Sequence, residues 1–509
     1  MSSLNARLAD LPADRLAGLR RGVEKESLRA DTRGSLALTP HSTALGSALT
    51  HPSITTDFCE SQVELITAPH ATPEACVSEL RQIHQFVHRQ IGDELLWASS
   101  MPCELPADET IPLGRYGSSN VGRAKSIYRM GLGLRYGRRM QTISGIHYNW
   151  SMPGLSNDEY FGLIRNFRRQ SFLLLLLTGA SPAVCASFVE GRSHELQPIG
   201  QHTLGLPYAT SLRMGRLGYQ SDAQAALNVS YNCLEGYAAS LHGALTTPHP
   251  PYETIGVRNP GGEYNQLATS LLQIENEFYG TIRPKRTIRP GERPLHALRE
   301  RGVEYVEVRC MDLDPFEPLG IHEQTMRLLD VFLLHCLLSD SPPDTPQEIA
   351  ALARNQHRTA ARGREPGLKL ERDGREIGIV EWGREILNEC APIAERLDRA
   401  EGGHAHAEAL LEAKRRLDRP DSTPSARVLS TIERDFGGSF RGFALAQSEQ
   451  AQRQLRNMPL DAATAGRFQR MAHDSVLEQR QREAADTLPF ETYRERYLAP
   501  EQLGVMSGC

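Results

Sequence analysis

Several features that define particular classes of protein are missing from this sequence. Its nine cysteines include no pair with CxxC spacing, so neither a disulfide framework nor a thiolate zinc site is expected. The longest apolar run, residues 172–177, is far shorter than the roughly 20 residues that span a bilayer. The first 20 residues alternate charged side chains with leucine, unlike a secretory signal peptide. We therefore expect a soluble protein of the reducing cytoplasm with no membrane partner.

Aromatic side chains and excess charge are also scarce. Aromatics make up 6% of the 509 residues, so the core must depend on leucine, valine, isoleucine and alanine. The net charge is −5, from 57 basic and 62 acidic residues, which argues against nonspecific binding of nucleic acid. The sequence has neither the GxxxxGK[ST] phosphate loop nor a GxSxG element. Any nucleotide must therefore be bound in some other way.

The composition changes near residue 340. Up to that point, strand-like and helix-like segments alternate; beyond it the chain turns polar and helical. We expect a catalytic α+β body over residues 1–340 and a mainly helical portion over 341–509, packed on the same body. The expected strands are 21–30, 60–67, 141–152 and 302–310. The expected helices are 4–20, 73–95, 161–177, 222–245, 322–338, 392–417 and 462–485.

Three of the strand-like segments carry acidic residues where a core pattern does not require them. Glu24 and Glu26 are two residues apart and so share one face of a strand. The same parity places further polar groups together on the other two segments: Glu60 with Glu64, just after Asp57, and Tyr305 with Glu307 and Arg309. A face of this kind is costly unless water or cations neutralise it.

Oxygen-rich clusters suit Mg²⁺, or alternatively Mn²⁺, bound together with substrate phosphates. His147 shares a strand face with Asn149, and a neutral imidazole can join such a site. Each segment taken alone is equally compatible with the solvated face of an antiparallel strand. The spacing does not establish that the three strands are neighbours.

A basic segment lies at residues 280–286. Arg283, Lys285 and Arg286 follow Tyr279 closely, and cations at this density can hold phosphate oxygens, although a solvated loop is the alternative. The small, polar stretch 116–123 has the composition of a loop near a ligand. Residue patterns alone thus predict an enzyme with a polyanion site and a divalent-metal site, without naming a substrate.

Eight motifs, in order along the chain, resemble the proteobacterial type of the glutamate–cysteine ligase family. They read GVEKESLR (22–29), ALTHPSITTDFCESQVELIT (48–67), YGSSNVGRAKSIYR (116–129), MQTISGIHYN (140–149), GASPAVC (179–185), LPYATSLRMGRLGY (206–219), QIENEFYGTIRPKR (273–286) and EYVEVRCMDLDPFEPLG (304–320). The resemblance extends over roughly residues 15–490 and is looser in the last third.

This resemblance implies a glutamine synthetase-like antiparallel sheet that forms a funnel-shaped acidic active site surrounded by helices. It also implies a reaction. The γ-carboxylate of L-glutamate attacks ATP to give γ-glutamyl phosphate, and the amine of L-cysteine then displaces phosphate, in the first step of glutathione biosynthesis. Glutathione is the expected feedback inhibitor, and a monomer is expected.

The resemblance further implies residue roles. One Mg²⁺ would be held near the glutamate by Glu26, Asp57 and Glu64, with Glu60 as a neighbour. Another would be held at the ATP phosphates by Glu24, His147 and Glu307. Arg309 would stabilise the transferring phosphoryl group, Arg213 would pair with the glutamate α-carboxylate or phosphate oxygens, and Arg129 is a second phosphate ligand beside Arg283, Lys285 and Arg286. The cysteine pocket would be formed by Tyr128, Tyr219 and Tyr279.

Two other readings stay open at this point. A sister ligase on the same scaffold would use a different amine, and an inactive relative would have kept only a binding role. The presence of all seven metal and phosphoryl positions argues against the second. Cys59 and Cys310 have the parity opposite to the acidic face, so we interpret them as core thiols rather than nucleophiles.

Overall fold

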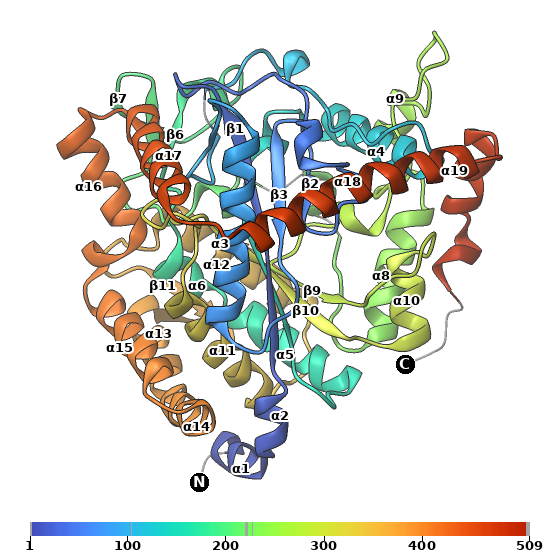
Figure 1. Cartoon of the computed structure of the whole chain (residues 1–509). Coiled ribbons are helices and arrows are strands. Elements are labelled where there is room, and N and C mark those ends of the chain that lie inside the picture. Colours follow the sequence, from blue (N-terminus) through green and yellow to red (C-terminus); the bar gives the residue numbers. More distant parts are fainter. Residues whose placement is uncertain (1–2, 103, 219–221, 226, 505–509) are drawn as a thin grey trace.

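An antiparallel sheet forms the centre of the molecule (Figure 1). The computed structural model describes residues 3–102, 104–218, 222–225 and 227–504. Six strands pair in the order β2-β3-β1-β5-β10-β9, and a seventh, β4, extends β1. Their bounds are Arg20–Ala30 (β1), Ile54–Thr56 (β2), Gln62–Ile66 (β3), Leu95–Leu96 (β4), Ile146–Ser151 (β5), Ile282–Lys285 (β9) and Tyr305–Met311 (β10). The α+β class and the antiparallel sheet expected from the sequence are confirmed.

One face of this sheet is apolar and covered by helices. Val23, Tyr148 and Val308 are cross-strand neighbours on this face, and each is almost completely buried. Helices that cover it and pack on one another are α3 (Pro73–Gln90), α5 (Asn157–Gln170), α6 (Phe172–Thr178) and α11 (Glu323–Leu338). Because side chains alternate along a strand, the residues between these core positions project from the opposite face.

Most predicted elements are present, but four predicted helices are divided. The helix expected over 161–177 is formed by α5 and α6, which meet at Ser171. The helix expected over 4–20 is two helices, α1 (Ser3–Asp10) and α2 (Ala13–Ala17), because Pro12 disfavours a helical residue before it and has no N–H to donate. Residues 222–245 contain α7 (Asp222–Ala225) and α8 (Leu234–Thr246). Residues 392–417 contain α14 (Ala391–Glu401) and α15 (Ala405–Asp418), separated at Gly402 and Gly403, which both have positive φ angles.

Further elements complete the chain. They are α4 (Asn120–Tyr136), α9 (Pro250–Ile255), α10 (Pro294–Arg301), α12 (Pro346–Arg362), α13 (Ile379–Glu389), α16 (Pro424–Phe436), α17 (Phe440–Asn457), α18 (Ala462–Ala485) and α19 (Phe490–Leu498). Two small sheets contain β6 (Ala183–Cys185), β7 (Gln197–Gly200) and β8 (Thr203–Gly205), and β11 (Lys369–Arg372) with β12 (Arg375–Gly378). Short 3-10 helices are η1 (Thr43–Leu45), η2 (Asp108–Thr110), η3 (Met140–Thr142), η4 (Ala186–Val189), η5 (Leu212–Met214), η6 (Glu275–Glu277), η7 (Pro420–Ser422) and η8 (Pro500–Leu503).

The C-terminal helices spread over the N-terminal part of the chain. In Figure 1, α18 extends as a long helix from the region of α3 toward α19 at the right-hand edge of the view. Ser475 of α18 accepts a hydrogen bond from the backbone N–H of Ser47, and α19 packs against α4. This part of the chain therefore contacts the elements that carry several of the candidate site residues.

Two further observations concern expectations from composition. Within the part of the chain that the structure describes, no helix combines the length and apolarity needed to cross a membrane. Six cysteines are free and buried, as expected for core thiols, and they include Cys59 and Cys310. Among the described residues, Cys233 is disulfide-bonded, which differs from the reduced thiols expected from the sequence.

Candidate active site

The sheet face opposite the core collects the predicted carboxylates. Glu26 is the cross-strand partner of Glu64, and Glu24 is the partner of His147. On the next strand pair, Asn149 of β5 lies opposite Glu307 of β10. Cross-strand partners place their side chains on the same face. Four adjacent strands, β3, β1, β5 and β10, thus bring together acidic residues that are up to 283 positions apart in the sequence.

His147 lies at the centre of this acidic face. Its Nδ1 is 3.3 Å from an oxygen of Glu24 and 3.7 Å from an oxygen of Glu307, and its Nε2 is 3.6 Å from an oxygen of Glu26. The other oxygen of Glu24 accepts a hydrogen bond from Asn149 Nδ2 at 2.8 Å. The imidazole is thus within reach of three carboxylates at once.

Two of the carboxyl groups are hard to ionise as they stand. Burial, with repulsion from Asp57, raises the pKa of Glu26 to about 8. Burial also raises the pKa of Glu64 well above its usual range, and the nearby carboxylates of Glu24 and Asp57 add to this effect. Both groups would ionise readily if a divalent cation lay among them.

The opposite end of the carboxylate row is already neutralised by cations. Burial alone would raise the pKa of Glu307, but Lys285 at 3.3 Å and Arg309 at 3.1 Å hold it well below its usual range. Burial and the charge of Arg309 lower the pKa of His147, which favours the neutral imidazole that can bind a metal. At one end of the face, burial and neighbouring carboxylates keep the pKa values of Glu26 and Glu64 raised. At the other end, Glu307 is ionised and paired with Lys285 and Arg309.

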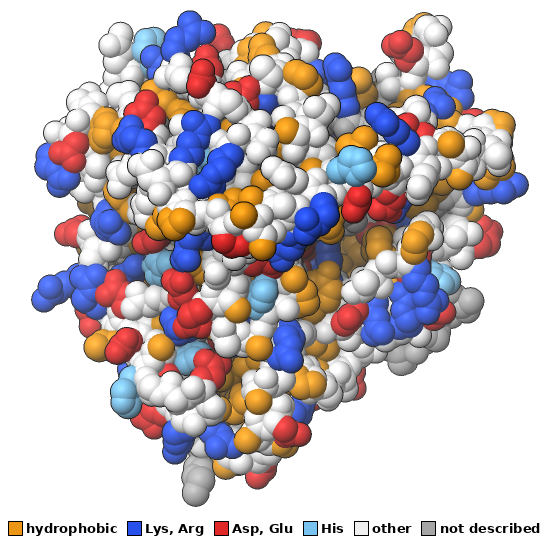
Figure 2. Space-filling view, viewed as in Figure 1, with side chains coloured by type: hydrophobic (Ala, Val, Ile, Leu, Met, Phe, Trp, Pro, Cys, Tyr) orange, Lys and Arg blue, Asp and Glu red, His pale blue; other side chains and the backbone are white. Residues whose placement is uncertain are grey.

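A cavity of about 390 Å³ lies over this face. Its lining includes the carboxylates Glu24, Glu26, Asp57, Glu64 and Glu307, the imidazole of His147, and the cations Lys125, Arg129, Arg283, Lys285 and Arg309. Figure 2 shows the surface hollowed on the side where Figure 1 places α18, β9 and α10, with basic and acidic side chains intermingled around the hollow. Both charge signs thus meet in one enclosed space.

The donor set at the acidic end fits a hard divalent cation. Glu24, Glu64 and His147 each present one ligand atom, and these atoms lie within 4.8 Å of one another. Carboxylate oxygens with one imidazole nitrogen suit Mg²⁺ or Mn²⁺. This trio combines residues from both of the ligand sets implied by the family resemblance, so the two sets lie next to each other on the sheet face.

Comparisons with known proteins agree with this geometry. A family model described as glutamate–cysteine ligase matches residues 6–359. A glutamate–cysteine ligase of Alcanivorax borkumensis is 47% identical over 505 residues, covering 95% of this chain and 96% of that protein. A glutamate–cysteine ligase of Pseudomonas aeruginosa is also 47% identical, covering 96% of this chain and 95% of that one.

The chain belongs to the glutamate–cysteine ligase family.

A solved structure supports the same relationship. The glutamate–cysteine ligase of Francisella tularensis, in complex with AMP, superposes with a TM-score of 0.90 at 36% identity. The match covers 95% of this chain and 98% of that one. The fold of this family member therefore extends over 95% of the chain, including most of the helical part beyond residue 359.

Three residues predicted for the ligase site lie outside the acidic cavity. Glu60 accepts backbone N–H groups of His41 and Arg115 at 2.9 and 2.8 Å, so its oxygens hold loops together. Arg286, the residue after β9, donates to the carbonyl of Arg301 at 2.7 Å. These contacts occupy both side chains in structural roles that residue spacing could not reveal.

Arg213 is the third of these residues. Its guanidinium donates to the carbonyl of Arg309 on β10 at 2.8 Å. It passes close to Gly145, where a Cβ atom would come within 2.0 Å of the guanidinium. Gly145 in turn donates its N–H to Glu26 at 2.7 Å, so Arg213 supports the strand end that positions this carboxylate.

The predicted tyrosines and Arg129 divide between the cavity and an undescribed segment. Tyr128 and Tyr279 line the cavity, and the hydroxyl of Tyr279 accepts a hydrogen bond from Gln141 at 2.9 Å. Arg129 stacks over Tyr116 at 4.4 Å and donates to the carbonyl of Asp57, so it holds that residue in place. Tyr219 lies outside the described residues.

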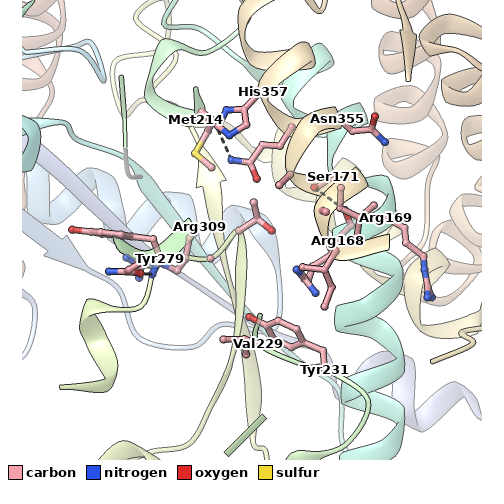
Figure 3. A pocket seen from close by; sticks show the side chains of 18 of the residues that line it. Arg168, Arg169, Ser171, Met214, Val229, Tyr231, Tyr279, Arg309, Asn355 and His357 are labelled. Carbon is pink, nitrogen blue, oxygen red and sulfur yellow. Dashed lines mark hydrogen bonds between the residues drawn. The ribbon is translucent and has the colours of Figure 1, made fainter. Parts of the chain in front are cut away.

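A second cavity of about 300 Å³ adjoins the first, and Arg309 and Tyr279 line both. Figure 3 shows it with Arg309 and Tyr279 at one side and Arg168 and Asn355 at the other. Arg213 also lines it, and no carboxylate does among the residues that the structure describes. The ligase thus has a cation-rich space on the border of its acidic one.

Sequence reasoning missed several residues of the ligase cavity. Lys125 lies one helical turn before Arg129 on α4, and burial lowers its pKa to about 8. Its spacing from Arg129 was a usable signal. Tyr493 and Tyr497 come from α19, where an aromatic residue recurs at helical spacing after Phe490. This aromatic spacing is visible in the sequence, but it does not indicate which part of the chain the helix packs against.

Proposed function

We propose that this chain forms γ-glutamylcysteine from L-glutamate and L-cysteine, with ATP converted to ADP and phosphate. Membership of the glutamate–cysteine ligase family gives the reaction class, and it places the chain at the first step of glutathione biosynthesis. A carboxylate is a poor electrophile, and its phosphorylation supplies a leaving group. The amine of cysteine then displaces phosphate to form the γ-peptide bond.

The observation that carries the proposal is the charge layout of the cavity. Glu24, Glu26, Glu64 and His147 form an acidic cluster at one end, and Lys285 and Arg309 flank Glu307 at the other. Transfer of a phosphoryl group to a carboxylate brings two anions together, so cations must screen the reacting oxygens. A binding module would have no need of this combination.

We assign Mg²⁺, with Mn²⁺ as the alternative, to the acidic cluster. Glu24, Glu64 and His147 would hold one ion, and Glu26, Asp57 and Glu307 would complete the metal sites. Bound metal supplies charge that screens the phosphate oxygens of ATP and orients them. Glu60 is left out of this set because both of its oxygens already accept backbone hydrogen bonds.

The cations have distinct proposed roles. Arg309 would contact the transferring phosphoryl group, since it lies between Glu307 and His147 and faces the cavity. Lys285 and Arg283 on β9 would hold further phosphate oxygens. Arg213, which lines the second cavity and lies 3.9 Å from a carboxylate oxygen of Asp312, would pair there with the α-carboxylate of glutamate.

Other parts of the proposal rest on the family alone. Tyr128 and Tyr279 would form the cysteine pocket, together with Tyr219. Feedback inhibition by glutathione, a monomeric state and a cytoplasmic location remain predictions. The division at residue 340 also remains one, and the contribution of Tyr493 and Tyr497 to the cavity argues for a single functional unit.

The test is an assay of phosphate release with glutamate, Mg²⁺-ATP and L-cysteine, with the product identified by mass. We expect cysteine-dependent release and a γ-glutamylcysteine product. Preference for 2-aminobutyrate, alanine or glycine would instead identify a sister ligase on the same site. Absence of release with every amine, from folded protein, would refute the catalytic proposal.

A further inference from the structure

We propose that Tyr493 and Tyr497 of α19, with Ile288, form the subsite for the adenine base of ATP. This assignment rests on the proposed function and adds to it the part of the cavity that selects the nucleotide. Both tyrosines come from the last described α-helix, which lies far beyond the region matched by the family model.

The first support is the grouping of the cavity lining. Most of the carboxylates, with Arg283, Lys285 and Arg309, project from the sheet. Leu267, Ile274 and Tyr493 instead belong to a small apolar cluster separate from the main core. Both groups line the same cavity. The cavity therefore has a charged part suited to a triphosphate and an apolar part suited to a flat, uncharged ring.

The second support is the path of the chain from β9. Lys285 ends this strand and pairs with Glu307 in the charged part. Ile288 follows three residues later, which limits its Cα to about 10 Å from that of Lys285. Ile288 lines the cavity and is 50% exposed. A ligand ring lying against it would bury this surface.

The third support is that the tyrosines are fixed in place before any ligand binds. Their rings stack at 5.8 Å with an angle of 7° between the planes. Arg293 lies over the Tyr497 ring at 4.8 Å and donates to the Tyr497 carbonyl at 2.8 Å, while its other nitrogens bind Glu275. The Glu275 carboxylate also accepts the backbone N–H of Leu295. A preorganised aromatic wall lowers the entropic cost of binding a base.

The alternative occupant of an apolar part is the small side chain of cysteine. A thiol needs little space, and Tyr128 and Tyr279 already provide aromatic surface beside the carboxylates. The additional apolar wall of two tyrosines and an isoleucine matches a larger ring. Stacking of a base on an aromatic side chain changes affinity by about tenfold or more.

The test compares Tyr497→Leu with Tyr497→Phe and with Tyr264→Leu. Tyr264 packs edge-on against Phe490 in the same aromatic cluster but does not line the cavity. AMP is the probe for binding, because it carries the base with a single phosphate. Steady-state kinetics then give KM separately for ATP and for glutamate.

We expect Tyr497→Leu to raise the Kd for AMP and the KM for ATP about tenfold, with the KM for glutamate unchanged. The preference for ATP over CTP should narrow in the same variant. Tyr497→Phe should restore most of the affinity, because the ring is retained, and Tyr264→Leu should bind AMP like the parent protein. Equal AMP affinity in folded Tyr497→Leu would overturn the inference.

Ile288→Ala keeps the test decisive if the tyrosine variant fails to fold, since Ile288 is half exposed. It should also weaken AMP binding, and unchanged binding there would overturn the inference as well. The two proposals fail separately. A parent protein that binds AMP through these residues but forms no product with any amine would retain the base subsite and lose the ligase function.

Discussion

Replacing Glu26 with glutamine distinguishes two effects of its buried charge, the destabilisation of the metal-free protein and the binding of Mg²⁺. The substitution keeps the shape of the side chain, and the carbonyl oxygen of glutamine can still accept the Gly145 N–H now bonded to Glu26 at 2.7 Å. What changes is the charge. In the metal-free protein that charge opposes folding, whereas in the presence of Mg²⁺ it should bind the ion.

The magnitude follows from the pKa of Glu26, which burial and Asp57 raise from 4.5 to about 8. An acid with a raised folded-state pKa destabilises the folded state as pH rises above its unfolded value, and the penalty is complete above the folded value. Each pKa unit corresponds to about 1.36 kcal/mol. Water in the cavity relieves part of this cost. We therefore expect metal-free Glu26→Gln, at pH 8 in EDTA, to be more stable than the parent protein by about 1–3 kcal/mol.

In saturating Mg²⁺ the parent protein should instead be more stable than Glu26→Gln. An ion at 100 times its Kd stabilises the folded protein by about 2.7 kcal/mol, and the variant should lose most of this gain. Turnover should fall about a hundredfold or more. Ionisation of Glu26 on metal binding should also release a proton near pH 7, which the parent protein should show and the variant should lack.

The assay is chemical denaturation of both proteins at pH 5 and pH 8, in EDTA and in Mg²⁺, with calorimetry in two buffers to count protons. Glu253→Gln is the matched control, because Glu253 is an exposed carboxylate outside the cavity. The reasoning would be refuted if Glu26→Gln were less stable than the parent in EDTA at pH 8, or if it gained as much stability from Mg²⁺.

Three further substitutions or treatments test other parts of the site. Glu307→Gln should abolish turnover. Unlike Glu26→Gln, it should also lower the stability of the metal-free protein at neutral pH by about 1–3 kcal/mol, because Glu307 is ionised and paired with Lys285. Equal stability of variant and parent in chemical denaturation would contradict this. Glu60→Gln should lower the free energy of unfolding by about 1–3 kcal/mol, because the glutamine amide would turn an N–H donor toward a backbone N–H. Stabilisation of the variant by Mg²⁺ should be unchanged. Loss of this stabilisation in a Mg²⁺ titration would return Glu60 to the metal site. Burial raises the pKa of both Cys59 and Cys310 to about 12, so iodoacetamide should leave activity intact while the protein stays folded, as mass spectrometry of the labelled peptides would show.

The acidic face could be predicted strand by strand but not as a whole. Period-two spacing correctly placed Glu24, Glu26 and Glu64 on polar faces, because the alternation of side chains is local. Strand order depends on contacts between distant segments, and only the family resemblance implied it. Strand β9 was not predicted, since Pro284 and the surrounding cations are untypical of a sheet interior; as an edge strand it tolerates proline.

The remaining differences have similar causes. Residue type could not separate Glu60, which binds backbone N–H groups, from Glu64, which lines the cavity, because both have the same parity. Arg286 differs from Lys285 by one position, but β9 ends at Lys285, so Arg286 is outside the sheet. Tyr497 was out of reach because its role depends on α19 meeting α4 and α10, a contact across some 200 residues or more.

The contact between α19 and the cavity also bears on how the protein is made. The carboxylates of β1 and β3 leave the ribosome more than 400 residues before Tyr493. The acidic face can be completed once β10 has been made, some 180 residues before α19 supplies the aromatic wall. Nascent chains would bind divalent cations before they could discriminate between nucleotides, and a truncation before α19 would leave a metal-binding protein with a weakened hold on ATP.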